Sequence, residues 1–213
     1  MLDADVDLPL FLKGLIVGFG IAVPVGPIAL LCIQRSINNG WLAGFISGLG
    51  AALADSYYGA IAALGVNLVQ DFLVAHRRPV GLLGGAFLCL IGVRILLRRH
   101  RLEPAKPKRD AVSLLGDFAS TFLLTLANPT TILAFIAIFA AIGEGAAGDS
   151  FGGAMTLVLG VLCGSALWWS CLAFGVGTLR HRLDESARQW ISRGSAAMMI
   201  AFGLYVTGQA LLR

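Results

Sequence analysis

The chain has 213 residues, of which 57% are hydrophobic and only 13% are charged. Soluble domains carry about 25% charged residues, so this composition excludes an ordinary soluble domain and indicates an integral membrane protein with several spans. The net charge of +4 does not indicate nucleic-acid binding, because most basic residues lie in loops between apolar segments, where they act as topology signals.

Six apolar segments are long enough to cross a hydrocarbon core, which requires about twenty mostly apolar residues per helix. We therefore predict an all-α fold with six transmembrane helices, at 9–33, 41–66, 80–97, 113–141, 152–177 and 193–212. Asn38-Asn39-Gly40 separates the first two segments, and the charged stretch from Arg180 to Arg193 is predicted to be an amphipathic connector before the last. Acidic residues precede the first segment where a secretory signal has basic ones, so we interpret it as a retained helix.

The first segment contains the motif Pro24-Val25-Gly26-Pro27, about fifteen residues from its start. Proline frees backbone carbonyls from the helix, and glycine permits a bend. An unpaired backbone group in lipid costs several kcal/mol, so such a break is tolerated only inside protein or beside a water-filled cavity. A broken helix of this kind points to the binding site of a transporter. We therefore predict a break at which Pro24, Gly26 and Pro27 line a substrate pathway and the exposed backbone carbonyls and amides can bind charged groups of a substrate. A kink that serves only curvature is the alternative.

The second segment carries Asp55, the only acidic residue well inside a predicted span. A charged carboxylate near the bilayer centre costs about 2.5–3.5 kcal/mol on insertion scales, so Asp55 is a candidate for proton transfer or for pairing with a substrate ammonium group. The alternative is a structural acid hydrogen-bonded to the broken helices. Tyr58 shares a helix face with Asp55 and several small residues, and this face either lines the pathway or packs against another helix.

Residues 101–112 form a basic linker that divides the chain into two three-helix units, 1–100 and 113–213. We interpret the linker as a solvated connection, with a regulatory or anionic-lipid site as the alternative. The loops after spans one, three and five contain eleven Lys and Arg residues, Arg35 among them, against four on the opposite side. The positive-inside rule then predicts that both termini lie outside the cytoplasm.

The fourth segment contains Asn128 and Pro129, at a depth similar to that of the first motif. Pro129 predicts a second helix break, and Asn128 could cap a half-helix or bind the substrate. In the fifth segment, Ser165 and Trp168 match the acid and the tyrosine of the second span when the two halves are aligned. Trp168 could form a cation–π contact with a substrate ammonium group, although paired tryptophans more often pack or anchor at the interface.

An internal repeat is indicated when Pro27 is aligned with Pro129. Downstream, the glycine-to-glycine intervals 50–65 and 160–175 are both fifteen residues long. Because each half has an odd number of spans, the second half must cross the membrane in the opposite sense. An inverted repeat is therefore predicted, with the substrate path where the halves meet.

Three features resemble the LysE/RhtB family of bacterial amino-acid exporters: the stretch from Gly18 through Pro27 into Ala29, the Asp-bearing second helix, and Leu126-Ala127-Asn128-Pro129. The resemblance covers essentially the whole chain. It implies secondary export of amino acids or close analogues across the inner membrane, coupled to the proton gradient, and we expect no cofactor. Many relatives carry a basic residue directly after the NP pair, whereas this chain has Thr130-Thr131, so a substrate carboxylate would lose that cation.

Other functional classes fit the residues less well. An enzyme is disfavoured because all three histidines lie in loops and Asp55 has no second intramembrane acid. A metal-ion or other small-solute exporter is the alternative function, but one aspartate and dispersed cysteines provide few metal ligands. A scaffold protein would need neither two breaks nor a buried acid. GxxxG pairs such as Gly44/Gly48 could support a homodimer, but packing within the chain explains them equally well.

Overall fold

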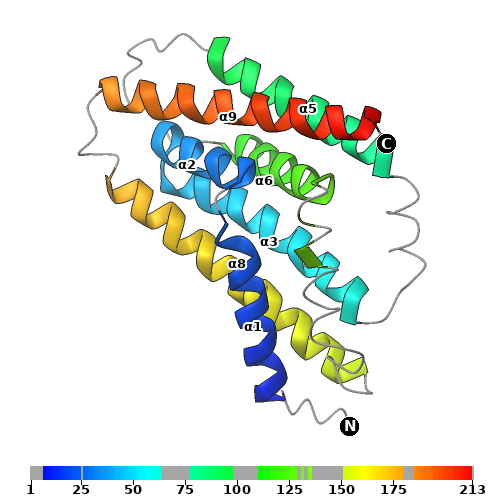
Figure 1. The fold of residues 1–213 in the computed structure, drawn as a ribbon. Helices are drawn as coiled ribbons and strands as arrows, with labels where there is room; N and C mark the ends of the chain where they lie inside the picture. Colours follow the sequence, from blue (N-terminus) through cyan, green and yellow to red (C-terminus); the bar gives the residue numbers. More distant parts are fainter. Residues whose placement is uncertain are drawn as a thin grey trace.

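The computed structural model describes residues 7–24, 26–63, 77–97, 110–128, 131, 134–135, 151–179 and 185–212, and the regular elements within them are α-helices (Figure 1). In chain order they are α1 (Leu8–Ala22), α2 (Pro27–Asn39), α3 (Trp41–Ala63), α5 (Arg77–Leu97), α6 (Ala111–Leu126), α8 (Phe151–Leu179) and α9 (Glu185–Leu212). The predicted all-α class is therefore confirmed for these residues. By length and composition, Phe151–Leu179 and Gln189–Leu211 can each cross a membrane, and α1 with α2 would make a third, bent span.

The first span is broken where its proline–glycine motif predicts. α1 ends at Ala22 and α2 begins at Pro27, whose ring suits the first position of a helix because that position makes no intrahelical N–H bond. The axes of the two helices differ by 81°. α2 ends at Asn39, and Gly40 has a φ of 98°, a left-handed conformation that glycine adopts without strain. The predicted boundary at Gly40 is therefore confirmed.

The second predicted break follows the end of α6 at Leu126. The N–H of Asn128 donates to the carbonyl of Thr125 at 3.1 Å, so the last turn tightens as the helix stops. Pro129 and Thr130 lie outside the described residues. The end of α6 thus agrees with the prediction, up to the residue before the proline.

Two boundaries drawn from the sequence are wrong. Arg35, which the charge count assigns to a loop, lies inside α2. The predicted connector from Arg180 to Arg193 is helical from Glu185 onward, because α9 begins there and continues to Leu212. Residues 185–193 include neither proline nor glycine, so no residue in them ends a helix.

Helices of the first half pack mainly against helices of the second half. α1 packs along α8, α6 packs along α3, and α3 and α8 contact each other. α5 and α9 form another close pair (Figure 1). α2 contacts α3, α8 and α9, so the segment after the first break touches helices from both halves.

Glycines allow the paired helices to approach closely. A Cβ atom at Gly164 of α8 would lie 2.1 Å from the carbonyl oxygen of Leu15 in α1. A Cβ atom at Gly50 of α3 would lie 2.4 Å from the carbonyl oxygen of Phe118 in α6. Within a membrane, where helix association depends on van der Waals contact and hydrogen bonds, such small residues permit backbone-to-backbone packing.

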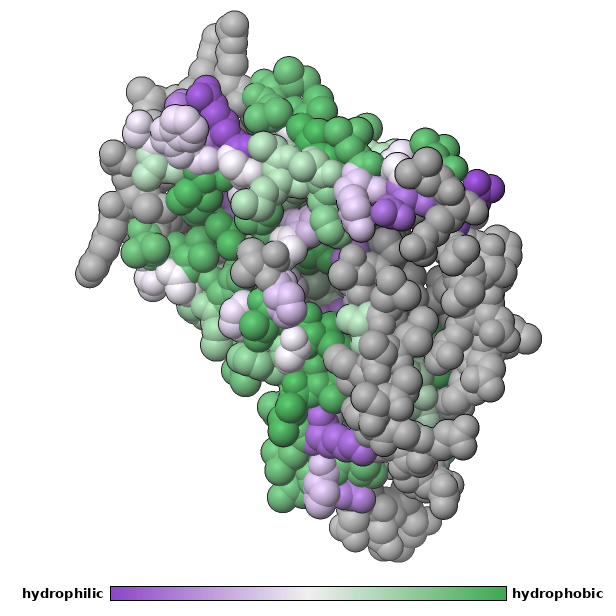
Figure 2. All heavy atoms as spheres, in the orientation of Figure 1, coloured by the Kyte–Doolittle hydropathy of each residue, from purple (hydrophilic) through white to green (hydrophobic). Residues whose placement is uncertain are grey.

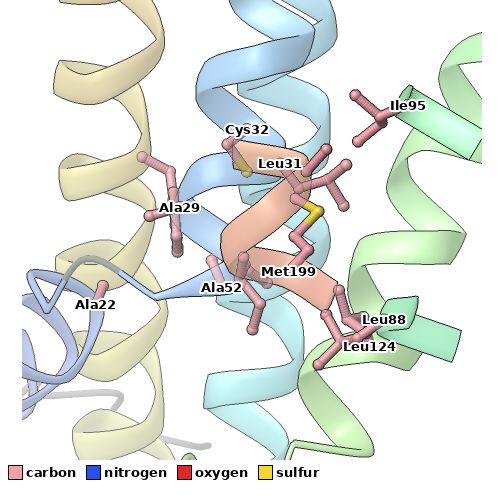
Figure 3. Close-up of a cluster of buried hydrophobic side chains, with 13 residues drawn as sticks. Ala22, Ala29, Leu31, Cys32, Ala52, Leu88, Ile95, Leu124 and Met199 are labelled. Carbon is pink, nitrogen blue, oxygen red and sulfur yellow. The ribbon is translucent and has the colours of Figure 1, made fainter. Parts of the chain in front are cut away.

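One cluster of buried side chains receives residues from all seven described helices. Nine of its members are labelled in Figure 3: Ala22, Ala29, Leu31, Cys32, Ala52, Leu88, Ile95, Leu124 and Met199. Much of the surface of the described residues is also apolar, as the green areas of Figure 2 show for one face, and Leu97 is 76% exposed. An exposed apolar surface of this extent suits contact with acyl chains.

The close approach of α1 and α8 generates a test of the packing. Gly164→Ala should lower the stability by about 1–3 kcal/mol, because the added methyl group meets backbone that cannot move aside. Gly175→Ala on the same helix is the matched control, since a Cβ atom there has no neighbour within 4 Å. Thermal unfolding in detergent measures both, and equal midpoints would contradict the packing.

Candidate functional site

Asp55 is buried between α3 and α8, where it is 3% exposed. The hydroxyl of Ser165 on α8 donates to its Oδ2 at 2.7 Å. The indole Nε1 of Trp169 donates to the same hydroxyl oxygen at 3.1 Å. A short chain of hydrogen bonds therefore holds the carboxyl group against α8. The structure thus brings together Asp55 and Ser165, two of the residues that the sequence singles out.

Tyr58 connects the helix of Asp55 with the end of α6. Its hydroxyl donates to the main-chain carbonyl of Leu126, the last residue of α6. Carbonyl groups at a helix end lack intrahelical donors, so Tyr58 supplies a donor where the helix stops. Its ring also lies against Phe135, with the ring centroids 5.9 Å apart.

A small apolar cluster brings the ends of two broken helices to the same place. Tyr58 and Phe135 belong to this cluster, and Ile21 and Leu126 pack against it. Ile21 lies at the end of α1 and Leu126 at the end of α6. Both helix ends therefore meet on the side of α3 that carries Tyr58, about one turn from Asp55.

Gly26 and Pro27 shape the start of α2. Gly26 is the residue before the helix and offers no side-chain cap, and Pro27 has no N–H group. Among the described residues, the amides of the first turn therefore have no capping side chain. Pro27 is buried whereas Pro24 is exposed, so Pro27 is the proline of this motif that faces the protein interior.

Trp168 lies on α8 with its ring against Phe19 of α1, with ring centroids 5.6 Å apart and planes at 81°. Its indole N–H is buried, and none of the described residues accepts a hydrogen bond from it. Buried donors without a partner are uncommon in proteins. The N–H of Trp168 therefore has the capacity to bind an acceptor from a ligand.

Asn128 stabilises its own turn. Its side-chain amide donates to the hydroxyl of Thr131 at 3.0 Å, and the N–H of Thr131 donates to the carbonyl of Asn128 at 3.1 Å. The structure thus gives this asparagine a capping role within the second break. The remaining candidates of this motif, Pro129 and Thr130, lie outside the described residues.

The sequence reasoning missed one charged site. Asp117 of α6 is buried, and its carboxylate pairs with the guanidinium of Arg35 on α2 at 3.2 Å. The sequence does carry a signal for the arginine, because no helix-breaking residue stands between Pro27 and Arg35. Its partner could not be identified from spacing, since the two residues lie far apart along the chain.

Residues 19–209 match the family described as LysE type translocator. The chain belongs to this family. Over 205 residues it is 27% identical to a Bacillus subtilis (strain 168) protein named "Putative amino acid efflux protein", with 95% of this chain and 97% of that protein covered.

The chain is also similar in sequence to two other bacterial proteins. It is 32% identical over 198 residues to an uncharacterized membrane protein of Pseudomonas aeruginosa, covering 87% of this chain and 88% of that one. It is 22% identical over 205 residues to the Threonine efflux protein of Escherichia coli (strain K12), covering 93% and 98%. No solved structure matches the chain.

The LysE type translocator is thus a multi-pass membrane protein of a family of transporters, not an enzyme. This confirms the family that the chain resembles in its first proline motif, its Asp-bearing second helix and its NP motif. Across the part of the chain that the structure describes, no three His, Cys, Asp or Glu residues come together as a possible metal site.

The hydrogen bond from Tyr58 can be tested in the translocator. Tyr58→Phe should lower the stability by about 1–3 kcal/mol, because a carbonyl at the end of α6 loses its donor. Tyr57→Phe is the matched control, since Tyr57 is 49% exposed. Thermal unfolding in detergent compares the two variants. An identical midpoint for both would show that the hydroxyl does not support the end of α6.

Proposed function

We propose that this LysE type translocator exports amino acids or similar small zwitterionic metabolites from the cytoplasm by proton antiport. The observation that carries the proposal is the burial of Asp55 between two helices, next to the ends of α1 and α6. Relatives named as amino acid and threonine efflux proteins support the substrate class. The family itself supports a transport function.

Asp55 suits proton coupling because a carboxyl group can hold either a proton or a substrate ammonium group. A buried negative charge is costly when it is unpaired, so one of the two partners must occupy the site during each crossing. Proton entry from outside then displaces the substrate, and proton release inside makes the site ready for the next one. Intramembrane acids commonly act in proton relays of this kind.

The substrate carboxylate is assigned to neutral donors near the first break. The start of α2 has no side-chain cap, and the positive end of a helix dipole favours an anion. α2 also contacts α8, which carries the N–H of Trp168, a donor without an acceptor among the described residues. This assignment requires no basic residue after the NP pair, where this chain has Thr130.

The proposed architecture has six transmembrane helices in two inverted three-helix repeats, 1–100 and 113–213, joined by the linker 101–112. The exchanged packing of α1 with α8 and of α6 with α3 supports it, because a two-fold relation between the halves interchanges these pairs. The hydrogen bond between Asp55 and Ser165 supports it as well. These residues are equivalent when Gly50 is aligned with Gly160, and equivalent residues meet each other only near a two-fold axis.

The proposed location is the bacterial inner membrane, with both termini outside the cytoplasm. The excess of Lys and Arg in the loops after spans one, three and five supports this orientation. Placing Arg35 inside α2, and Arg188 and Arg193 inside α9, removes three of the eleven residues and leaves eight against four, so the direction of the bias is unchanged.

Proteoliposomes loaded with labelled amino acids test the function directly. Asp55→Asn should reduce transport driven by a pH gradient at least tenfold at unchanged protein level, because the amide cannot take up a proton. Asp110→Asn is the matched control, since Asp110 is an exposed helix cap that asparagine can replace. Full pH-driven transport by Asp55→Asn would eliminate the coupling role. Metal ions in the substrate panel test the alternative exporter function.

The carboxylate assignment has its own test. Trp168→Phe retains an aromatic ring and removes the N–H, so the KM for the exported amino acid should rise roughly tenfold or more, as expected for a lost hydrogen bond to a charged group. Trp190→Phe is the control, since Trp190 is 73% exposed. An unchanged KM for Trp168→Phe would remove this residue from the binding site.

A further inference from the structure

The charged site formed by Arg35 and Asp117 is built from three helices. The Nε of Arg35 on α2 lies 3.2 Å from Oδ1 of Asp117 on α6. The guanidinium also donates hydrogen bonds to the hydroxyl of Ser47 on α3 at 2.8 Å, to the carbonyl of Asp117 at 2.8 Å, and to the hydroxyls of Thr121 and Ser120 on α6 at 2.7 and 2.8 Å. We refer to these five residues as the arginine cluster.

The arginine cluster is mostly buried. The side chains of Arg35 and Asp117 are each 11% exposed, and Ser47 and Thr121 are fully buried. Two charges taken out of water are stable together only when they are paired and their remaining hydrogen-bonding groups are satisfied. The contacts above meet that requirement, so the cluster binds α2 firmly to α3 and α6.

The arginine cluster lies at one end of the bundle. Arg35 is near the end of α2, whereas Ser47 and Asp117 are near the beginnings of α3 and α6. The chain connects α2 directly to α3 there, and the basic linker precedes α6, so the positive-inside rule makes this the cytoplasmic end. Along α3, eight residues separate Ser47 from Asp55, which corresponds to about 12 Å. The cluster therefore stands between the cytoplasmic end and the buried acid.

The other half of the chain has no such charges at the equivalent positions. In the alignment of Pro27 with Pro129, Arg35 corresponds to Ala137 and Asp117 to Leu15. Leu15 packs with its backbone against Gly164 of α8. At equivalent positions, the two halves therefore carry different residues: Arg35 and Asp117, which form the ion pair, and the apolar Ala137 and Leu15. The arginine cluster is thus specific to one end of the bundle.

We infer that the arginine cluster is the cytoplasmic gate of the transport path, and this inference rests on the proposed export function. Substrate from the cytoplasm reaches Asp55 only after α2 separates from α6 at this end. A zwitterion is suited to open the gate, because its carboxylate can pair with Arg35 and its ammonium group with Asp117. Neither charge is then left buried without a partner.

Cys32 provides a reporter inside the chain. It lies on α2 three residues before Arg35 and is 0% exposed. The experiment uses a protein in which Cys89, Cys163 and Cys171 are replaced by alanine, in vesicles that expose the cytoplasmic face. A membrane-impermeant maleimide then measures how often water reaches the space behind the cluster.

Asp117→Asn should increase the rate of Cys32 labelling at least tenfold, because an amide cannot pair with the guanidinium charge. Asp117→Glu is the matched control and should label slowly, since it retains the carboxylate. In vesicles of the opposite orientation, the asparagine variant should label at the slow rate of the unmodified chain. Exported amino acids added on the cytoplasmic side should raise the rate in the unmodified chain.

A second reporter separates gating from general loosening. With Cys89 as the single cysteine, on α5 beside α9, the rate should be the same in the unmodified chain and in Asp117→Asn. Faster labelling of both cysteines, or of neither, would overturn the gate. Labelling of Cys32 in the Asp117→Asn variant requires no transported substrate. The experiment can therefore refute the gate without refuting the proposed export of amino acids, and the transport assay can refute the export without refuting the gate.

Discussion

The structure depends on the constraint that a polar group inside a bilayer must find its partner within the protein, because no water is available there. Asp55 meets this constraint through Ser165 on α8, and Tyr58 meets it through the end of α6. Arg35 meets it through α3 and α6. Each solution joins two or more helices, so the polar residues determine which helices must stay together.

Short side chains can make these contacts only because the helices lie close to one another. Between α3 and α8, a Cβ atom at Gly48 would lie 2.4 Å from the Cβ of Trp169, and a Cβ atom at Gly59 would lie 3.5 Å from Val161. Within this close interface, the serine hydroxyl reaches the Asp55 carboxyl group at 2.7 Å. The abundance of glycine, with 27 residues in the chain, therefore serves the polar site as well as the packing.

α2 combines the features on which transport would depend. Its start carries the uncapped amides of the first break, its middle contributes Leu31 and Cys32 to the buried cluster, and its end carries Arg35. The 81° angle between α1 and α2 allows α1 to follow α8 while α2 contacts α3 and α9. A movement of this one short helix would change the environment of the substrate, the core and the gate together.

Sequence alone determined where the helices break, because breaks depend on local backbone chemistry. It placed the end of the first span and the start of the last span several residues from where α2 ends and α9 begins. Pro27 starts α2, Gly40 ends it with a positive φ, and α6 stops before the NP pair. Aligning Gly50 with Gly160 also pairs Asp55 with Ser165, which form a hydrogen bond in the structure. Tertiary structure decided the rest. The pairing of Arg35 with Asp117 spans 82 residues. Only the packing of α8 against α1 places the ring of Trp168 against Phe19 and leaves its N–H without an acceptor among the described residues.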